Sequence, residues 1–282
     1  MTDAAHNARP RAGASSSARG ETDMNGKGFA LGGAVFAALL FLLALGVPGR
    51  AAAAPGRVLF VGDSLVDYWS ATAWAARIAK SLGSASLGDI EVASNDRMGA
   101  LEEHLSPTYG ERGLAAIRRG GWDAVVLQEN AFEPLKRPDH FSAAVEKLAA
   151  EARKAGARVV LLEPFAVAAG SVVYNSSEQW SGGSPAAMQG RLRDAVSRVA
   201  GRLKLDQARV GDAFELALAR DSTLALWEND KLHPSAAGAY LQACVFVVVL
   251  TGLDPRESHW RPDTGVSEKE AGVLRAAAWS VK

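Results

Sequence analysis

A serine, an aspartate and a histidine stand in this 282-residue sequence where they could perform nucleophilic chemistry. Ser64 lies in the sequence GDSL, directly after the apolar run Val58–Val61, and Asp230 and His233 are three residues apart in the sequence DKLH. A serine hydroxyl is a poor nucleophile until a base removes its proton, and a histidine oriented by an aspartate can be that base. These residue types therefore predict the transfer of an acyl group through an acyl-serine intermediate.

Each of these residues also has a structural interpretation. Ser64 could cap a following helix, because serine accepts hydrogen bonds from the free N–H groups of a first turn. Asp63 could hold its turn together through backbone N–H groups, and Asp230 could stand at a helix start. His233 could be an ordinary surface residue that Pro234 keeps out of helical geometry. The sequence GDS alone is a weak signal, so the nucleophile interpretation depends on Asp230 and His233 as well.

Short apolar runs alternate with longer amphipathic segments from residue 55 onward. Strands separated by helices require crossover connections, so a mainly parallel sheet with helices on both faces is expected. Such sheets hold their sites at the carboxyl ends of the strands, where Ser64 stands. The expected strands are Arg57–Val61, Ile90–Ala93, Asp123–Leu127, Arg158–Leu162 and Ala208–Val210, and the expected helices are Leu65–Leu82, Leu101–Leu105, Leu114–Ile117, Asp139–Ala155, Ala186–Leu203, Ala213–Leu218, Pro234–Leu250 and Ser267–Val281.

One long loop, Pro164–Pro185, carries aromatic residues in a glycine- and serine-rich setting. Loops of this length in compact domains are usually functional or disordered. Trp180 is the best candidate for stacking on a sugar or covering an acyl group, and Tyr174 is a second candidate contact with substrate. Other aromatic residues near the motifs, among them Tyr68 and Trp69, are mostly expected to pack in the core or at its edge.

The overall composition excludes some classes of protein. Lys plus Arg and Asp plus Glu both number 31, so the formal charge of zero gives no sign of a nucleic-acid partner. Cys244 is the single cysteine and lies in an apolar run, which predicts a buried thiol. Asp63, Asn130 and His233 could bind a metal, but the sequence holds no second Asp or His cluster to complete such a site. The histidines other than His233 receive no role.

The first 54 residues are expected to lie outside the folded domain. Residues 1–23 show no hydrophobic periodicity and are interpreted as a disordered leader or as a segment upstream of a true start at Met24. Residues 24–54 are interpreted as a targeting segment. The folded domain is therefore expected to cover residues 55–282.

The targeting segment has the order of features that export signals have. Lys27 precedes the uninterrupted apolar run Phe29–Val47, and four alanines follow at positions 51–54. Small residues after an apolar run favour cleavage by a signal peptidase, here near Ala53 or Ala54. The run is also long enough to cross a bilayer, so a retained anchor is the alternative, and membrane contact would then be limited to this segment.

Four motifs in the expected order make the chain resemble the SGNH hydrolases, the GDSL esterase and lipase superfamily. The serine of that family lies in a GDS motif after the first strand, matched by Ser64, and its closing D-x-x-H motif is matched by Asp230 and His233. The family also has a glycine in the loop after the second strand, matched by Gly99, and an asparagine after the third, matched by Asn130. The resemblance covers about residues 57–251.

This resemblance implies a three-layer α/β/α fold with a mainly parallel, flavodoxin-like five-stranded sheet and a serine hydrolase that needs no cofactor. Ser64 would be the nucleophile, His233 the base, and Asp230 the residue that orients the imidazole. The backbone N–H groups of Ser64 and Gly99 and the side-chain amide of Asn130 would form the oxyanion hole.

The third motif departs from the family pattern. It is usually G-x-N-D, but this sequence reads Gln128-Glu129-Asn130-Ala131, so the glycine and the final aspartate are both replaced. This indicates a divergent branch of the superfamily. Side chains alternate along a strand, so Gln128 lies on the same side as Asn130 and is a further candidate contact with substrate.

The expected function is that of an exported serine esterase acting on a short-chain acyl ester, of which acetyl is one, of a glycan or small molecule. One alternative is acyl transfer through the same acyl-serine, with a sugar hydroxyl in place of water. Another is a non-catalytic module that binds glycans or lipids. The intact set of Ser64, Asn130, Asp230 and His233 argues against the binding module.

Overall fold

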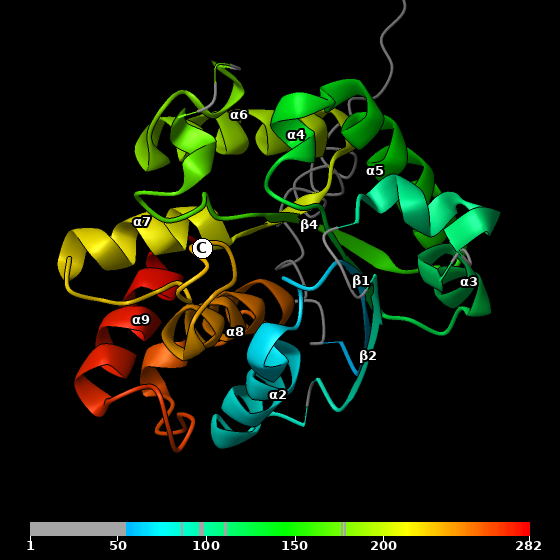
Figure 1. Cartoon of the computed structure of the whole chain (residues 1–282). Coiled ribbons are helices and arrows are strands. Elements are labelled where there is room, and N and C mark those ends of the chain that lie inside the picture. The colour runs from blue at the N-terminus through cyan, green and yellow to red at the C-terminus, as the bar shows by residue number, and fades with distance from the viewer. Residues whose placement is uncertain (1–54, 86, 96–98, 110–111, 176, 178) are drawn as a thin grey trace, which may run out of the picture. The chain divides into compact units, whose positions relative to one another are not determined.

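The computed structural model describes residues 55–282 except 86, 96–98, 110–111, 176 and 178 (Figure 1). The expected leader and the expected signal peptide or anchor, residues 1–23 and 24–54, lie outside the described residues. In the part of the chain that is described, no helix is both long and apolar enough to cross a membrane.

A five-stranded sheet forms the centre of residues 55–282, and all of its strand pairs are parallel. Its strand order is β2-β1-β3-β4-β5, which is the flavodoxin-like order. This confirms the predicted fold class, and each expected strand is present with ends within two residues of the prediction. The strands are β1 Arg57–Gly62, β2 Asp89–Ser94, β3 Ala124–Gln128, β4 Arg158–Glu163 and β5 Asp206–Arg209.

Helices cover both faces of the sheet because successive strand residues point to opposite sides. Val58 and Phe60 of β1 pack in one core with α2, α7, α8 and α9, whereas Leu59 and Val61 pack in a second core with α3, α5 and α6. Figure 1 shows the two groups on opposite sides of the strands. The helices are α2 Ala71–Ser81, α3 Arg112–Arg119, α4 Glu133–Lys136, α5 Pro138–Lys154, α6 Pro185–Leu203, α7 Val210–Arg220, α8 Ala236–Thr251 and α9 Glu268–Ser280.

The irregular connections contain short 3-10 helices. The expected helix Leu101–Leu105 is one of them, and two more lie within the long loop after β4, which is otherwise irregular as predicted. They are η1 Tyr68–Ser70, η2 Leu101–Leu105, η3 Pro107–Tyr109, η4 Val172–Asn175, η5 Gln179–Ser181 and η6 Pro255–Glu257.

The segment after Ser64 differs from the prediction. A helix was expected from Leu65, but α2 begins only at Ala71, after the 3-10 turn η1. The carboxylate of Asp67 accepts hydrogen bonds from the backbone N–H of Thr72 at 2.9 Å and from its hydroxyl at 2.7 Å, which supports the later start. Apolar residues at the start of this segment, such as Leu65, are buried in a turn and not in a helix, so their spacing wrongly predicted a helix from Leu65.

Helix α8 begins after the proline that was expected in its first turn. The hydroxyl of Ser235 accepts a hydrogen bond from the backbone N–H of Gly238 at 3.2 Å and caps the helix, so Pro234 precedes the cap. Pro234 instead pairs with Trp227 as an isolated antiparallel bridge. Cys244 is fully buried in this helix, as predicted.

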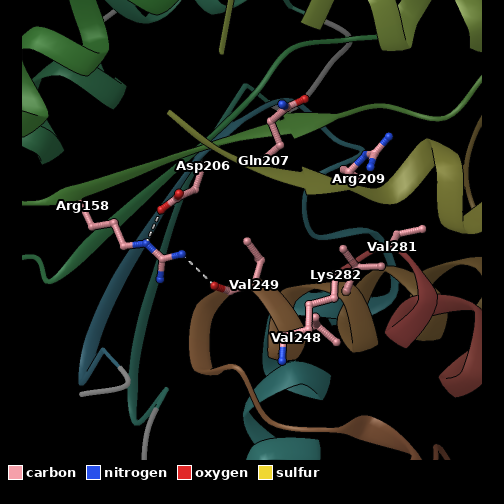
Figure 2. Close-up of a pocket in the computed structure, with 9 residues that line it drawn as sticks. Arg158, Asp206, Gln207, Arg209, Val248, Val249, Val281 and Lys282 are labelled. Carbon is pink, nitrogen blue, oxygen red and sulfur yellow. Dashed lines mark hydrogen bonds and ion pairs between the residues drawn. The ribbon is translucent and has the colours of Figure 1, made fainter. Parts of the chain in front are cut away.

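A cavity of about 270 Å³ lies beside edge strand β5 (Figure 2). Its wall includes Arg158, whose Nε pairs with Asp206 at 2.6 Å and whose Nη2 donates to the carbonyl of Val249 at 2.9 Å. This guanidinium therefore connects the first residues of β4 and β5 to α8. None of the residues of the predicted active site lines this cavity.

Candidate active site

The three residues of the predicted nucleophilic site meet at the carboxyl end of β1. Ser64 Oγ lies 3.2 Å from His233 Nε2, although the two residues are 169 positions apart in the sequence. His233 Nδ1 lies 2.6 Å from Asp230 Oδ2. With Asp230 ionised, Nδ1 donates to that carboxylate, which leaves Nε2 as an acceptor for the proton of the serine hydroxyl.

The turn that carries Ser64 is held by two side chains. Asp63 Oδ1 accepts a hydrogen bond from the backbone N–H of Leu65 at 2.8 Å, as the structural interpretation of Asp63 predicted. The backbone N–H of Asp63 donates to Gln128 Oε1 at 2.8 Å. Gln128 lies so close that a Cβ at Gly62 would stand 2.2 Å from Oε1, so only glycine fits there.

The side-chain amide of Gln128 is bonded at both of its ends. Its Nε2 donates to the carbonyl of Glu129 at 2.9 Å, its Oε1 accepts from Asp63, and only 2% of the residue is exposed. The predicted contact of Gln128 with substrate stays a prediction, although the amide is bonded inside the protein. The departure from the usual glycine replaces an open backbone position with a side chain that holds the serine turn.

His104 supports the same turn, and no sequence pattern indicated this role. Its Nδ1 accepts from the backbone N–H of Gly113 at 3.1 Å, so Nε2 carries the proton and donates to the carbonyl of Gly62 at 2.8 Å. Burial lowers the pKa of His104, which favours the neutral ring. This buried imidazole therefore positions the end of β1 just before Ser64.

The other carboxylate oxygen of Asp63 is buried without a hydrogen-bond partner among the described residues. Burial raises the pKa of Asp63 to about 6, although hydrogen bonds from Leu65 and Gln128 act in the opposite direction. Ionised Asp63 therefore carries a desolvation cost, and it lies directly before the serine.

Glu129 connects the loop after β2 to the end of β3. Its carboxylate accepts from the backbone N–H of Leu101 at 3.1 and 3.2 Å and from that of Asn130 at 2.9 Å. Burial raises the pKa of Glu129 well above its ordinary value. No pattern in the sequence indicates this role, because Leu101 is 28 residues away and becomes a neighbour only in the folded chain.

Asn130 is placed on the strand end next to that of Ser64, since β1 pairs with β3. Its Oδ1 accepts from the backbone N–H groups of Phe132 at 2.9 Å and Glu133 at 3.0 Å. These bonds fix the plane of the amide. The Nδ2 group makes no hydrogen bond with the described residues, so it remains a donor for a ligand.

Gly99 is buried in the loop after β2, close to Asn95 and Glu103. A Cβ at this position would stand 2.5 Å from Glu103 Oε2 and 2.6 Å from Asn95 Nδ2. A larger residue here would have to displace the ends of these two side chains. Its predicted role as an N–H donor to the oxyanion stays a prediction.

The His233 ring is also fixed from its face. The ring of Tyr68 stacks on the imidazole, with centroids 4.5 Å apart and planes inclined by 23°. Asp230 Oδ1 accepts from the backbone N–H groups of Leu232 and His233, both at 2.9 Å. Burial acts to raise the pKa of Asp230, but the hydrogen bonds from His233 and the backbone lower it below its ordinary value. The carboxylate is thus kept ionised beside the ring.

The two aromatic candidates in the long loop differ. The hydroxyl of Tyr174 donates to the carbonyl of Val167 at 2.6 Å, so it holds the loop. Trp180 is half-buried and packs edge-on against Phe132, with centroids 5.5 Å apart. Since Phe132 follows Asn130 by two residues, Trp180 lies near the end of β3 and remains a candidate contact with substrate.

Lys231 ties the long loop to the loop that carries Asp230 and His233. Its carbonyl accepts from the backbone N–H of Ala168 at 2.9 Å, and its Nζ donates to the carbonyl of Gly170 at 2.7 Å. Nothing in the sequence pointed to this link. Within the described residues, no three His, Cys, Asp or Glu side chains lie close enough together to hold a metal ion.

Comparisons with known proteins agree with this fold. No protein-family model and no curated protein sequence matches the chain. Among solved structures, the chain is similar to a protein from Slackia heliotrinireducens assigned as an SGNH hydrolase, with 27% identity over 68% of this chain and 97% of that chain and a TM-score of 0.54.

Two further solved structures share the fold at lower identity. A DUF4886 family protein from Bacteroides uniformis matches with 16% identity over 80% of this chain and 93% of that chain, at a TM-score of 0.62. An acetylxylan esterase from Geobacillus stearothermophilus matches with 19% identity over 73% of this chain and 98% of that chain, at a TM-score of 0.51. The chain therefore has the fold of the SGNH hydrolases, as the four motifs predicted.

Proposed function

We propose that the chain is an exported serine esterase that hydrolyses a short-chain acyl ester, such as an acetyl ester, of a glycan or small molecule. The observation that carries this proposal is the chain of contacts from Ser64 Oγ to His233 Nε2 at 3.2 Å and from His233 Nδ1 to Asp230 Oδ2 at 2.6 Å. The similarity in fold to an acetylxylan esterase supports the ester class.

The reaction uses the three side chains in sequence. His233 Nε2 takes the proton of Ser64 Oγ as the oxygen attacks the ester carbonyl carbon. The tetrahedral intermediate collapses, the bond to the alcohol oxygen breaks, and His233 returns the proton to the leaving alcohol. Water then attacks the acyl-serine with His233 again as base, which releases the acid and restores Ser64.

Negative charge develops on the former carbonyl oxygen in both halves of the reaction. The backbone N–H groups of Ser64 and Gly99 and the Nδ2 group of Asn130 are the proposed donors to this oxyanion. The hydrogen bonds that Asn130 Oδ1 accepts orient Nδ2 before substrate arrives. Donors that are already oriented stabilise the transition state without reorganisation.

Water is the proposed acyl acceptor because the site is open. The side chain of Asp230 is 47% exposed and that of His233 is 21% exposed, so solvent reaches the base directly. A transferase that uses a sugar hydroxyl gains from excluding water. The two activities separate in one assay, since a transferase converts an added sugar into its ester while a hydrolase releases free acid.

The test is labelling of the nucleophile in the full-length chain. A fluorophosphonate probe should label the wild-type protein at Ser64, and p-nitrophenyl acetate should be hydrolysed. Ser64→Ala should lose both properties, whereas Ser280→Ala on α9 should keep both. Labelling at a different serine, or unchanged turnover by Ser64→Ala, would contradict the proposal.

Export is tested separately from catalysis. Lys27, the run Phe29–Val47 and the alanines that follow support it. N-terminal sequencing of the protein recovered from outside the cytoplasm should begin near Ala54 or Pro55. Recovery of the uncleaved chain from the membrane fraction would favour the anchor instead.

A further inference from the structure

Exposed apolar surface is rare in the described part of the protein. Among the large apolar side chains described, the exposed ones are Trp69, at 47%, and Val172, at 81%. Isolated apolar residues on a surface need no explanation by themselves. The position of Trp69 is informative because its side chain is bonded to the loop that carries the proposed base.

The indole of Trp69 is connected to that loop through Glu228. Its Nε1 donates to Glu228 Oε1 at 2.9 Å, and the backbone N–H of Glu228 donates to the carbonyl of His233 at 2.8 Å. Tyr68, the preceding residue, stacks on His233. The indole is therefore held in a fixed orientation next to the proposed catalytic residues while its surface stays open to solvent.

The backbone at Trp69 is in an unfavourable conformation. Its φ is 57° and that of Ser70 is 59°, in the left-handed region that bulky residues rarely adopt. Strain of this kind is common at functional sites, where surrounding contacts maintain it. Here it allows Tyr68 to cover the imidazole while Trp69 turns outward.

We propose that Trp69 is a sugar-binding subsite, on whose exposed indole face a pyranose ring of the alcohol part of the ester stacks. This inference rests on the proposed esterase function and narrows its substrates to esters of glycans. A pyranose has an apolar C–H face that matches one aromatic ring, and hydroxyl groups at its edge. The carboxylate of Glu228 is bonded to the edge of the indole, and it can also accept hydrogen bonds from those hydroxyls.

The same surface fits a lipid interface less well. Trp69 and Val172 are single apolar side chains on separate segments and do not form a contiguous apolar patch of the size that marks such surfaces. The neighbouring carboxylate of Glu228 repels an anionic membrane. One amphipathic ring with an acidic group at its edge favours a saccharide.

Binding can be measured without chemistry in the full-length Ser64→Ala protein. The probes are xylohexaose and partially O-acetylated xylohexaose, titrated calorimetrically. Adding Trp69→Ala should raise Kd about tenfold, the order of magnitude expected for one aromatic contact, and adding Trp69→Phe should have a smaller effect. Adding Trp279→Ala should leave Kd unchanged. Trp279 lies on α9, where its ring contacts Arg256 and Lys282 and none of the residues of the site.

A second readout leaves the tryptophan in place. Saturating xylohexaose should slow the modification of Trp69 by N-bromosuccinimide, located by mass spectrometry, without slowing that of Trp279. Any of three results overturns the subsite. They are equal Kd values with and without Trp69→Ala, no protection of Trp69 by xylohexaose, and no binding of either probe at millimolar concentration.

The failure of the subsite and that of the esterase are distinguishable. In the protein with an intact Ser64, Trp69→Ala should lower the ratio of kcat/KM for acetylated xylohexaose to kcat/KM for p-nitrophenyl acetate about tenfold. An unchanged ratio with both esters hydrolysed overturns the subsite and leaves the esterase. Saccharide binding that depends on Trp69, without hydrolysis of either ester, overturns the esterase and leaves the subsite.

Discussion

The turn that carries Ser64 and the loop that carries His233 meet at 3.2 Å, yet different interactions hold them. The serine turn depends on buried side chains from distant parts of the chain. Gln128 binds the backbone of Asp63 from 65 residues away, and His104 binds the carbonyl of Gly62 from 42 residues away. Buried hydrogen bonds of this kind are costly to leave unmade.

The carboxylate that orients His233 is held by local bonds near solvent. Asp230 makes its hydrogen bonds to Leu232 and His233, which are two and three residues away, and its side chain is 47% exposed. Tyr68 adds a stacking contact to the ring. Changes to the serine turn should therefore affect both stability and activity, whereas changes to the histidine loop should affect activity alone.

The largest expected effect is on the histidine side. His233→Ala should lower kcat for p-nitrophenyl acetate by about 10⁴-fold or more, because no other group takes the serine proton. The melting temperature should stay close to that of wild type, since the imidazole bonds only to a partly exposed carboxylate and to the serine among the described residues. His140→Ala is the control, as this exposed histidine pairs with Glu102 and with no other described residue. A large fall in the melting temperature of His233→Ala would contradict the expected difference in stability effects between the serine turn and the histidine loop.

The second prediction separates Asn130 from Gln128. Asn130→Ala should lower kcat and kcat/KM together by about 10²- to 10³-fold with KM nearly unchanged, as expected for a donor that acts in the transition state. Gln128→Ala should instead destabilise the fold by about 1–3 kcal/mol, because the buried N–H of Asp63 loses its acceptor. Denaturant unfolding and steady-state kinetics measure the two effects.

The opposite result would reassign the third motif. A full loss of kcat with normal stability in Gln128→Ala, together with near-normal kcat in Asn130→Ala, would make Gln128 the donor. EDTA should change the activity of neither wild type nor variants. Activity that EDTA removes and a divalent ion restores would replace the serine mechanism with a metal site.

The third prediction concerns pH and Asp63. The pKa of Asp63 is raised from its ordinary value of 3.8 to about 6 by burial, so the folded state binds its proton more tightly than the unfolded state does. The stability contributed by this residue is therefore full below the unfolded pKa, falls as pH rises toward the folded pKa, and is constant above it. Asp63→Asn cannot ionise, so it does not lose stability as pH rises. Its side-chain oxygen can still accept the hydrogen bond from the backbone N–H of Leu65.

The free energy of unfolding of Asp63→Asn relative to wild type should accordingly rise by about 2–3 kcal/mol between pH 4 and pH 7. Urea unfolding at several pH values measures it, and Asp263→Asn, an exposed carboxylate, is the control. A relative stability that is flat across this range would mean that Asp63 is not the buried titrating group of the serine turn.

The smallest expected effect is that of Lys231→Met. This change removes the hydrogen bond to the carbonyl of Gly170 and loosens the long loop from the histidine loop. The free energy of unfolding should change by no more than about 0.5 kcal/mol, as for other exposed positions, while KM for a glycan ester rises about two- to fivefold. Lys147→Met on α5 should change neither quantity. Equal KM values in the two variants would show that the loop does not need this link.

Much of the fold and part of the site could be predicted because their signals are local. Strands β1, β3 and β4 are runs of apolar residues, and the alternation of strands with helices predicts a parallel sheet. Ser64 stands directly after one of these runs, and Asp230 and His233 lie three residues apart. Spacing of this kind can be recognised before the chain folds.

What only the tertiary structure decided is how these motifs are held and what lies around them. Gln128 was predicted to contact substrate but bonds to Asp63, and His104 and Glu129 received no role although both bind backbone at the strand ends. Their partners are 28 to 65 residues away in the sequence and become neighbours only through the strand order β2-β1-β3.

The exposure of Trp69 has the same kind of origin. The sequence predicted a helix through this position and core or edge packing for its ring, but the left-handed backbone of Trp69 and Ser70 turns the indole to solvent. The sequence by itself thus indicated the residues of the proposed chemistry and the strands that Ser64 and Asn130 follow. The direction of each side chain, and therefore which polar group is bonded internally and which faces substrate, depends on long-range contacts that no local pattern records.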